Sequence, residues 1–232
     1  MELTSIAFIP DGNRRYAFRS GIELAKSYQL GTEKAWDVLN WLVDYPKIRA
    51  GAFYTLSLEN LARSKAELAV LFKLFEKELD KAMDRRIIET EKISLKFIGR
   101  TAAFPKRIQQ KMREVEEFTE DNNKKTIYLA LGYNGQAEIV DAAKKFAESY
   151  KNNSVSLSEL NESSFNKFLY AEMPNPDLII RTSGTQRLSG FLTYQSAYSE
   201  LFFCPKFWPE FSKQDLDSAI TDFNERNRKF GK

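Results

Sequence analysis

The chain has 232 residues, of which 43% are hydrophobic and 29% are charged, a composition typical of a globular protein with a sizeable core. The formal net charge of +3 is too small to indicate nucleic acid as a partner, and one cysteine excludes an internal disulfide framework. The absence of histidine excludes Ser-His-Asp and Cys-His catalysis and His-ligated zinc, so chemistry must rest on carboxylates, arginines, hydroxyls, amides or a hard cation.

Apolar strand patterns alternate with helical patterns along the whole chain. In chain order, we expect strands near residues 6–9, 48–56, 93–98, 126–131, 178–180 and 201–203. We expect helices over residues 14–29, with a break at Gly21, and over residues 32–42, 105–118 and 136–150. We also expect a helix that begins at residue 65, a short pair of helices that ends near residue 170, and a last helix that begins at residue 212. This alternation predicts an α/β fold: one domain over residues 1–232, with an open, mainly parallel sheet of about six strands surrounded by helices.

The helix that follows Ser64 is predicted to be long and amphipathic. Ser64 and Glu67 have the spacing of a capping box at its first turn. Its apolar residues recur three and four positions apart and form one stripe: Leu68, Leu71, Phe72, Phe75, Leu79 and Met83. We interpret the stripe mainly as core packing, and one end of it can also line a cavity under the sheet.

The first strand ends in a turn that carries opposite charges. Asp11, Gly12 and Asn13 follow the apolar residues directly, and Arg14 and Arg15 come next. Ligands of open α/β sheets bind at the carboxyl ends of the strands, where a helix N-terminus also favours phosphate. One carboxylate with two guanidiniums at this point suits a metal-bound anion, most simply a diphosphate. An ordinary solvated turn is the alternative interpretation.

Three further strands also end in polar clusters. These clusters are Ser57-Leu58-Glu59-Asn60 with Arg63, Gly132-Tyr133-Asn134-Gly135, and Arg181-Thr182-Ser183-Gly184. The carboxyl ends of parallel strands meet at one edge, so we expect the clusters to converge on one anionic ligand.

The segment from Arg181 to Ser189 is the densest of these clusters. Arg181, Arg187 and the hydroxyl groups supply donors that match phosphate oxygens, although a polar surface loop is the alternative. Farther along the chain, Glu200 offers a carboxylate that could share a Mg²⁺ with Asp11 and the phosphates of a ligand.

Taken together, these motifs resemble the cis-prenyltransferases of the undecaprenyl diphosphate synthase family. The matching residues, in family order, are Asp11-Gly12-Asn13 with Arg15, Ser57, Glu59-Asn60, Arg63, Glu67, Gly99, Asp177 to Gly184, Arg187-Leu188-Ser189, Phe191-Leu192, Gln195, Ala197 to Leu201 and Trp208-Pro209. They span nearly the whole chain.

The resemblance implies an elongated hydrophobic tunnel, a homodimer and a Mg²⁺-dependent reaction. In that reaction an allylic prenyl diphosphate is joined to isopentenyl diphosphate and a new Z double bond forms. The implied catalytic residues are Asp11, Asn13, Ser57 and Asn60, and the implied metal ligands are Asp11 and Glu200. The implied substrate-binding residues are Gly12, Arg14, Arg15, Tyr16, Arg63, Arg181, Arg187 and Ser189.

We also expect a cytoplasmic protein with a peripheral membrane contact for product release, since no apolar run reaches the length of a membrane span and the N-terminus lacks a signal-peptide pattern.

Several residues depart from the family pattern. Tyr28 stands where the family usually has histidine, and Tyr16 stands where it usually has tryptophan. Thr55 beside the tunnel and Lys125 near its usual closure favour a shorter product. The C-terminal Arg-x-Gly of the family is replaced by residues 229–231, Lys-Phe-Gly.

These departures leave three alternatives open besides regular chain elongation. The first is short-chain or irregular condensation of allylic diphosphates. The second is a non-catalytic subunit that supports a partner synthase, although a subunit of that kind would not need the metal and phosphate residues. The third is a protein that binds or hydrolyses phosphate esters, which the lack of a clear general base makes less attractive.

Overall fold

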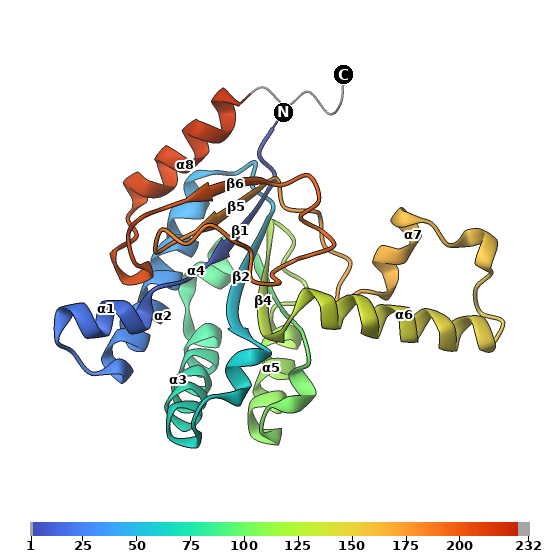
Figure 1. Ribbon diagram of the computed structural model, residues 1–232, viewed down its shortest axis with the longest axis horizontal. Coiled ribbons are helices and arrows are strands. Elements are labelled where there is room, and N and C mark those ends of the chain that lie inside the picture. Colours follow the sequence, from blue (N-terminus) through green and yellow to red (C-terminus); the bar gives the residue numbers. More distant parts are fainter. Residues whose placement is uncertain (1, 227–232) are drawn as a thin grey trace.

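A parallel β-sheet forms the centre of the computed structural model, which describes residues 2–226 (Figure 1). Its strands are Ser5–Ile9 (β1), Ala50–Ser57 (β2), Ile93–Ile98 (β3), Lys125–Tyr133 (β4), Leu178–Arg181 (β5) and Glu200–Phe203 (β6). The strand order is β3-β4-β2-β1-β5-β6, and each neighbouring pair is parallel. The predicted α/β fold with an open parallel sheet of six strands is therefore confirmed.

Helices surround this sheet, and most of them occupy the segments in which helical patterns were predicted. Two details differ, because Leu24–Trp41 is one continuous helix where a division between residues 29 and 32 was expected, and Arg86–Thr90 forms a short helix that was not predicted. The α-helices are Asn13–Ser20 (α1), Leu24–Trp41 (α2), Lys65–Asp84 (α3), Arg86–Thr90 (α4), Lys106–Phe118 (α5), Gly135–Lys151 (α6), Glu162–Phe165 (α7) and Lys213–Glu225 (α8). Short 3-10 helices span Leu42–Asp44, Glu59–Ala62, Thr101–Ala103, Leu157–Glu159, Asn166–Phe168 and Trp208–Glu210. No helix among residues 2–226 is long and apolar enough to cross a membrane.

The hydrophobic core lies on both faces of the sheet. On one face, buried residues of α2, α3, α5 and α8 pack against Phe8, which is fully buried and stacks on Phe53. Removing a side chain of that size from water stabilises the fold by about 1.5–3 kcal/mol. On the other face, a second cluster centres on Tyr133 and Phe191. Cys204 is buried in the first cluster, as expected of a core residue.

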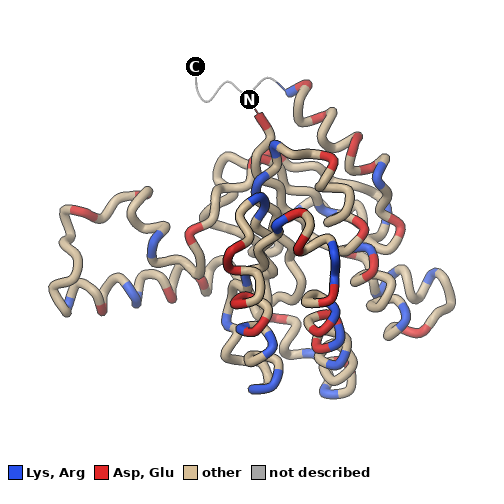
Figure 2. The backbone as a smooth tube through the Cα atoms, turned by 180° about the vertical axis from the view of Figure 1, so that it is seen from behind, with Lys and Arg blue, Asp and Glu red and all other residues tan. Residues whose placement is uncertain are grey.

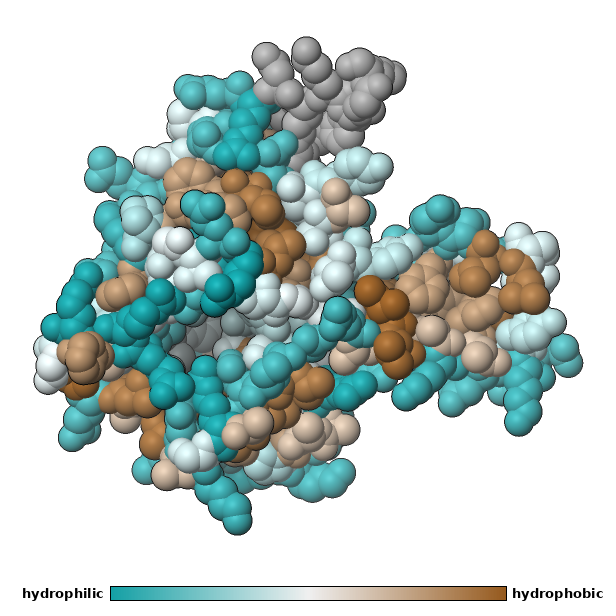
Figure 3. Space-filling view, viewed as in Figure 1, coloured by the Kyte–Doolittle hydropathy of each residue, from teal (hydrophilic) through white to brown (hydrophobic). Residues whose placement is uncertain are grey.

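Two parts of the molecule extend away from the sheet. Helices α3 and α5 contact each other and extend together below it, while α6 and α7 form an arm on the opposite side from α1 and α2 (Figure 1). Hydrophobic side chains gather on the arm, where Leu157 is exposed (Figure 3). Basic and acidic residues are interspersed along α3 and α5 (Figure 2). This mixture of charges agrees with the small net charge of the chain.

Candidate active site

The polar clusters that end the strands meet at the carboxyl edge of the sheet, as predicted. The hydroxyl of Tyr54 on β2 donates to the backbone oxygens of Tyr133 at 3.1 Å and Ser189 at 3.3 Å. Asn134, which caps α6, donates to Glu59 at 2.6 Å. Segments that are far apart in the sequence are thus tied together because the parallel strands end at the same edge.

Asp11 lies at the centre of this edge and pairs with two arginines. Its Oδ2 is 2.8 Å from Nη2 of Arg181, and its Oδ1 is 3.1 Å from Nη2 of Arg15. Burial opposes ionisation of the carboxyl, but the hydrogen bond and positive charge of Arg181 hold the pKa of Asp11 below its usual value. Asp11 is therefore a carboxylate at neutral pH.

The loop after β5 holds both arginines in place. Arg181 Nη1 donates to Ser189 Oγ at 2.8 Å, and Arg15 Nη2 donates to Ser183 Oγ at 2.6 Å. Thr182 Oγ1 accepts from the backbone nitrogen of Asp11 at 2.9 Å and donates to its backbone oxygen at 2.7 Å. The sequence predicted the hydroxyl groups of this segment as phosphate donors, whereas those of Thr182 and Ser183 bond the Asp11 backbone and Arg15.

Gly12 has a backbone that suits glycine alone. Its φ is +106°, and a Cβ at this position would lie 2.7 Å from the ring of Phe207. The next residue, Asn13, starts α1 and packs closely against α2, because a Cβ on Gly31 would lie 2.4 Å from Asn13 Oδ1. These close approaches hold the turn Asp11-Gly12-Asn13 between Gly31 of α2 and Phe207.

Two buried polar atoms of the predicted site have no hydrogen-bond partner. They are Asn13 Oδ1, an acceptor, and Arg181 Nε, a donor. Such atoms are rare in folded proteins because an unpaired buried polar group costs about 1–3 kcal/mol. Their presence beside Asp11 is consistent with groups that bind a ligand.

Ser57 and Asn60 support each other at the end of β2. The Ser57 backbone nitrogen donates to Asn60 Oδ1 at 3.4 Å, and the Asn60 backbone nitrogen donates to Ser57 Oγ at 3.3 Å. Both residues line the same cavity as Asp11 and Asn13. The structure thus brings the four predicted catalytic residues to one place.

Tyr28, the residue at the family histidine position, belongs to a network with Arg63 and Glu67. Its hydroxyl donates to Glu67 Oε1 at 2.6 Å and accepts from Arg63 Nη1 at 3.0 Å, while Arg63 also bonds Glu67 at 3.1 Å. Burial, together with the hydrogen bond to Glu67, raises the pKa of Tyr28 to about 12. The phenol therefore stays neutral over the physiological pH range.

This network changes the predicted capping box of α3. Ser64 Oγ does accept from the Glu67 backbone nitrogen at 3.2 Å. The reciprocal half is not formed, because the Glu67 carboxylate is bound by Tyr28 and Arg63 instead. Glu67 thus joins α2 to α3 beside the site.

Three other predicted substrate-binding residues lie at the surface of this region. Arg14 and Arg187 are exposed, and Tyr16 is half-buried on α1. The backbone oxygen of Arg187 accepts a hydrogen bond from Arg181, so its loop is attached to the site while its side chain faces solvent.

Glu200 lies at the amino ends of the strands, whereas Asp11 lies at their carboxyl ends. A single chain therefore does not bring the two predicted metal ligands together. Glu200 starts β6 and pairs with Leu178, whereas Arg181, at the Asp11 end of β5, pairs with Phe203. Three residues of strand correspond to about 10 Å. Glu200 Oε2 instead pairs with Arg226 Nη1 at 2.6 Å.

Of the two predicted metal ligands, a magnesium ion at the cavity mouth would therefore meet Asp11 but not Glu200 of the same chain. No group of three or more metal-ligating side chains occurs among residues 2–226. Mg²⁺ is commonly held by one or two carboxylates together with substrate phosphates. The donor set of Asp11 with the unpaired Asn13 Oδ1 fits this pattern when a diphosphate completes it.

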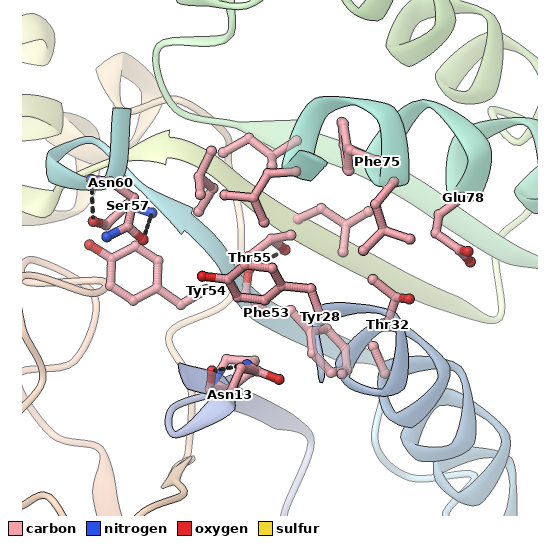
Figure 4. Close-up of a pocket in the computed structure, with 18 of the residues that line it drawn as sticks. Asn13, Tyr28, Thr32, Phe53, Tyr54, Thr55, Ser57, Asn60, Phe75 and Glu78 are labelled. Carbon is pink, nitrogen blue, oxygen red and sulfur yellow. Dashed lines mark hydrogen bonds between the residues drawn. The ribbon is translucent and has the colours of Figure 1, made fainter. Parts of the chain in front are cut away.

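A cavity of about 590 Å³ extends from this polar edge beneath the sheet. In Figure 4, Asn13, Ser57 and Asn60 lie toward one end, and Phe75 and Glu78 lie at the other. From the apolar stripe of α3, the cavity is lined by Leu71, Phe72, Phe75 and Leu79. The stripe thus serves both the core and a cavity with a polar mouth and an apolar interior.

The two residues expected to shorten the tunnel differ in position. Thr55 lines the cavity. Lys125 lies outside the cavity lining, at the start of β4, where its ammonium group donates to the backbone oxygens of Tyr45 and Ile48. Residues 229–231 lie outside the described part of the chain.

Sequence reasoning missed two polar residues that line the cavity far from its mouth. They are Trp36 on α2 and Glu78 on α3. Glu78 lies three positions after Phe75 and seven after Leu71 of the apolar stripe, so its place on the apolar face of the helix was the available signal.

Comparisons with known proteins show the family of this chain. The family model for undecaprenyl diphosphate synthase matches residues 9–231. A tritrans,polycis-undecaprenyl-diphosphate synthase (geranylgeranyl-diphosphate specific) of Pyrobaculum aerophilum is 39% identical over 99% of this chain and 96% of its own length. An isoprenyl transferase of Thermotoga maritima is 37% identical over 97% of this chain and 95% of its own length.

A solved structure shows the same fold over the whole chain. It is lavandulyl diphosphate synthase from Lavandula x intermedia in complex with dimethylallyl diphosphate, with a TM-score of 0.94 and 28% identity, covering 100% of this chain and 99% of that one. The chain therefore belongs to the undecaprenyl diphosphate synthase family of cis-prenyltransferases.

Proposed function

We propose that this protein joins isopentenyl diphosphate to an allylic prenyl diphosphate and forms a Z double bond. The observation that carries the proposal is a cavity whose polar mouth at Asp11 continues into an apolar interior along α3. A ligand with a charged head and a long apolar tail matches both parts. Because relatives are named as geranylgeranyl-diphosphate specific, we propose geranylgeranyl diphosphate as the allylic substrate.

The residues at the mouth would neutralise and orient the diphosphates. The positive charge of Arg15 would bind the allylic diphosphate and favour its departure as its C–O bond breaks, while Arg181, Arg187 and Ser189 would bind the diphosphate of isopentenyl diphosphate. Asn13 and Asn60 would orient the reacting groups, with Ser57 and Arg63 beside them. The new bond forms between the two substrates and the final proton can pass to a phosphate, so no protein nucleophile and no histidine are needed.

We also propose Mg²⁺ as the cofactor, with Asp11 as its ligand in this chain. A bound Mg²⁺ would supply further charge neutralisation at the diphosphate. Because Asp11 is kept ionised by its arginine neighbours, its carboxylate is available to a cation near neutral pH.

A homodimer and a peripheral membrane contact at product release remain part of the proposal. A metal shared by Asp11 and Glu200 would require a second copy of the chain, because the two residues lie at opposite ends of the strands of one sheet. Light scattering of the purified protein tests the dimer, and co-sedimentation with phospholipid vesicles tests the membrane contact.

The central experiment is product sizing. The purified protein is incubated with Mg²⁺, isopentenyl diphosphate and allylic diphosphates of one to four isoprenoid units, and the products are separated by chain length. We expect elongation, most rapid from geranylgeranyl diphosphate, and its loss when Mg²⁺ is chelated. Absence of product from every pair would reject a stand-alone enzyme and favour the non-catalytic subunit.

Irregular condensation of allylic diphosphates is a second candidate. The solved structure of the same fold holds dimethylallyl diphosphate, so this architecture accepts a short allylic diphosphate. Incubation with dimethylallyl diphosphate alone separates the candidates, because only irregular condensation yields product without isopentenyl diphosphate.

A further inference from the structure

The apolar end of the cavity contains a charged side chain. Glu78 on α3 is 9% exposed and lines the cavity together with Phe75 and Leu79 of the same helix. It lies at the end away from Asn13, Ser57 and Asn60 (Figure 4). Charged residues are seldom buried in this way unless they are paired, because desolvation of an ion is costly.

The carboxylate of Glu78 is held by two donors. Trp36 Nε1 on α2 donates to its Oε2 at 2.8 Å, and Lys81 Nζ pairs with its Oε1 at 2.8 Å. The guanidinium of Arg85 lies 4.8 Å from the ring centroid of Trp36. The indole is therefore fixed between α2 and α3 by a hydrogen bond and by a cation–π contact.

We propose that Glu78 and Trp36 limit the length of the prenyl chain that the cavity accepts. This inference rests on the proposed function and names the residues that set its product length. A growing apolar chain meets favourable contacts along α3 until it reaches the carboxylate. Beyond that point it would have to cover an ionised group and displace the indole, and both changes oppose further elongation.

The cavity has room for a prenyl chain of limited length. Its volume of about 590 Å³ falls within the range of roughly 300–1,000 Å³ that holds drug-sized ligands. Each isoprenoid unit that enters the apolar part gains binding energy because its hydrocarbon groups are removed from water. That gain ends where the wall becomes charged.

The test compares three single variants. Glu78→Gln keeps a side chain of the same shape and an acceptor for Trp36, but removes the charge. Glu78→Leu removes both the charge and the acceptor. Glu76→Gln is the matched control, since Glu76 lies on the same helix but pairs with Arg107 of α5 at 2.8 Å and does not line the cavity.

The first measurement is binding without isopentenyl diphosphate. Calorimetric titration uses prenyl diphosphates of increasing length, from geranyl diphosphate upward. For the wild type and Glu76→Gln we expect the affinity to rise with each unit and then stop rising. For Glu78→Leu we expect it to continue rising by about tenfold or more for the next unit, with Glu78→Gln between them.

The second measurement is product length. We expect Glu78→Leu to shift the main product to a longer chain by at least one isoprenoid unit, while Glu76→Gln keeps the wild-type product. The proposal would be overturned if both Glu78 variants bound the series and formed the product as the wild type does. In that case the contacts of Glu78 with Trp36 and Lys81 would only stabilise the packing of α2 against α3. A wild type that binds the series but forms no product would reject the proposed reaction, whereas the binding data would still decide the length limit.

Discussion

The guanidinium of Arg181 lies 2.8 Å from the carboxylate of Asp11, although 170 residues separate the two in the sequence. The side chain of Arg181 is 5% exposed and that of Asp11 is 28% exposed, so the pair is largely shielded from water. It fixes the loop after β1 to the end of β5 and places one negative and one positive group at the cavity mouth.

Asp11→Asn should lower the turnover of the proposed condensation by roughly 100-fold or more, because the amide cannot neutralise Arg181 or bind a cation as the carboxylate does. Turnover is measured as incorporation of labelled isopentenyl diphosphate at saturating substrate. Thermal unfolding of the same sample verifies that the variant is folded. Near-normal turnover would reject the role of Asp11.

Gly12→Ala should destabilise the protein more than Gly21→Ala. Both glycines have positive φ, +106° and +62°, so both substitutions strain the backbone by about 1 kcal/mol. A Cβ at Gly12 also meets Phe207 at 2.7 Å, whereas a Cβ at Gly21 meets nothing within 4 Å. We expect a total cost of about 3 kcal/mol for Gly12→Ala. Urea unfolding measures the loss in free energy of unfolding for each variant. Equal losses would show that Phe207 moves away from the new Cβ at little cost.

Tyr28→Phe should weaken catalysis because it removes the hydroxyl that bonds both Arg63 and Glu67, and these two residues then keep only their direct bond to each other. We expect about 1 kcal/mol of destabilisation and roughly a tenfold lower kcat, since Arg63 loses part of its orientation. Tyr45→Phe is the control, because it removes a tyrosine hydrogen bond to Asp217 away from the cavity. Equal activity losses in the two variants would contradict a specific role for Tyr28.

Lys125 should make the protein more stable as the pH rises through the alkaline range. Burial lowers its pKa from 10.5 to about 8, so between these values the unfolded chain binds more protons than the folded chain. The free energy of unfolding therefore rises from about pH 8 to about pH 10.5, by an amount on the order of 1 kcal/mol or more.

Lys125→Met tests this pH dependence. The substitution removes the ammonium group, so the variant should gain less stability than the wild type between pH 7.5 and pH 10 when both are unfolded by urea. Parallel pH profiles for the two proteins would show that Lys125 does not titrate in this range.

Local patterns in the sequence determined most of the secondary structure. Apolar runs such as residues 6–9 and 93–98 became strands, and three- and four-residue spacing in residues 65–84 became α3. The polar residues after β1, β2, β4 and β5 met at one edge because parallel strands must end on the same side. Sequence reasoning could therefore place Asp11, Ser57, Asn60 and Arg181 together.

The tertiary structure alone decided which partner each polar side chain takes. Glu67 of α3 accepts a hydrogen bond from Tyr28 of α2, and Glu78 faces a cavity instead of solvent. Periodicity cannot distinguish these positions, because it records which face of a helix is apolar but not what packs against it. Glu200 differs in principle, since it is the first residue of its strand whereas Asp11 follows the last residue of its own, and in a parallel sheet these positions lie at opposite ends of the strands.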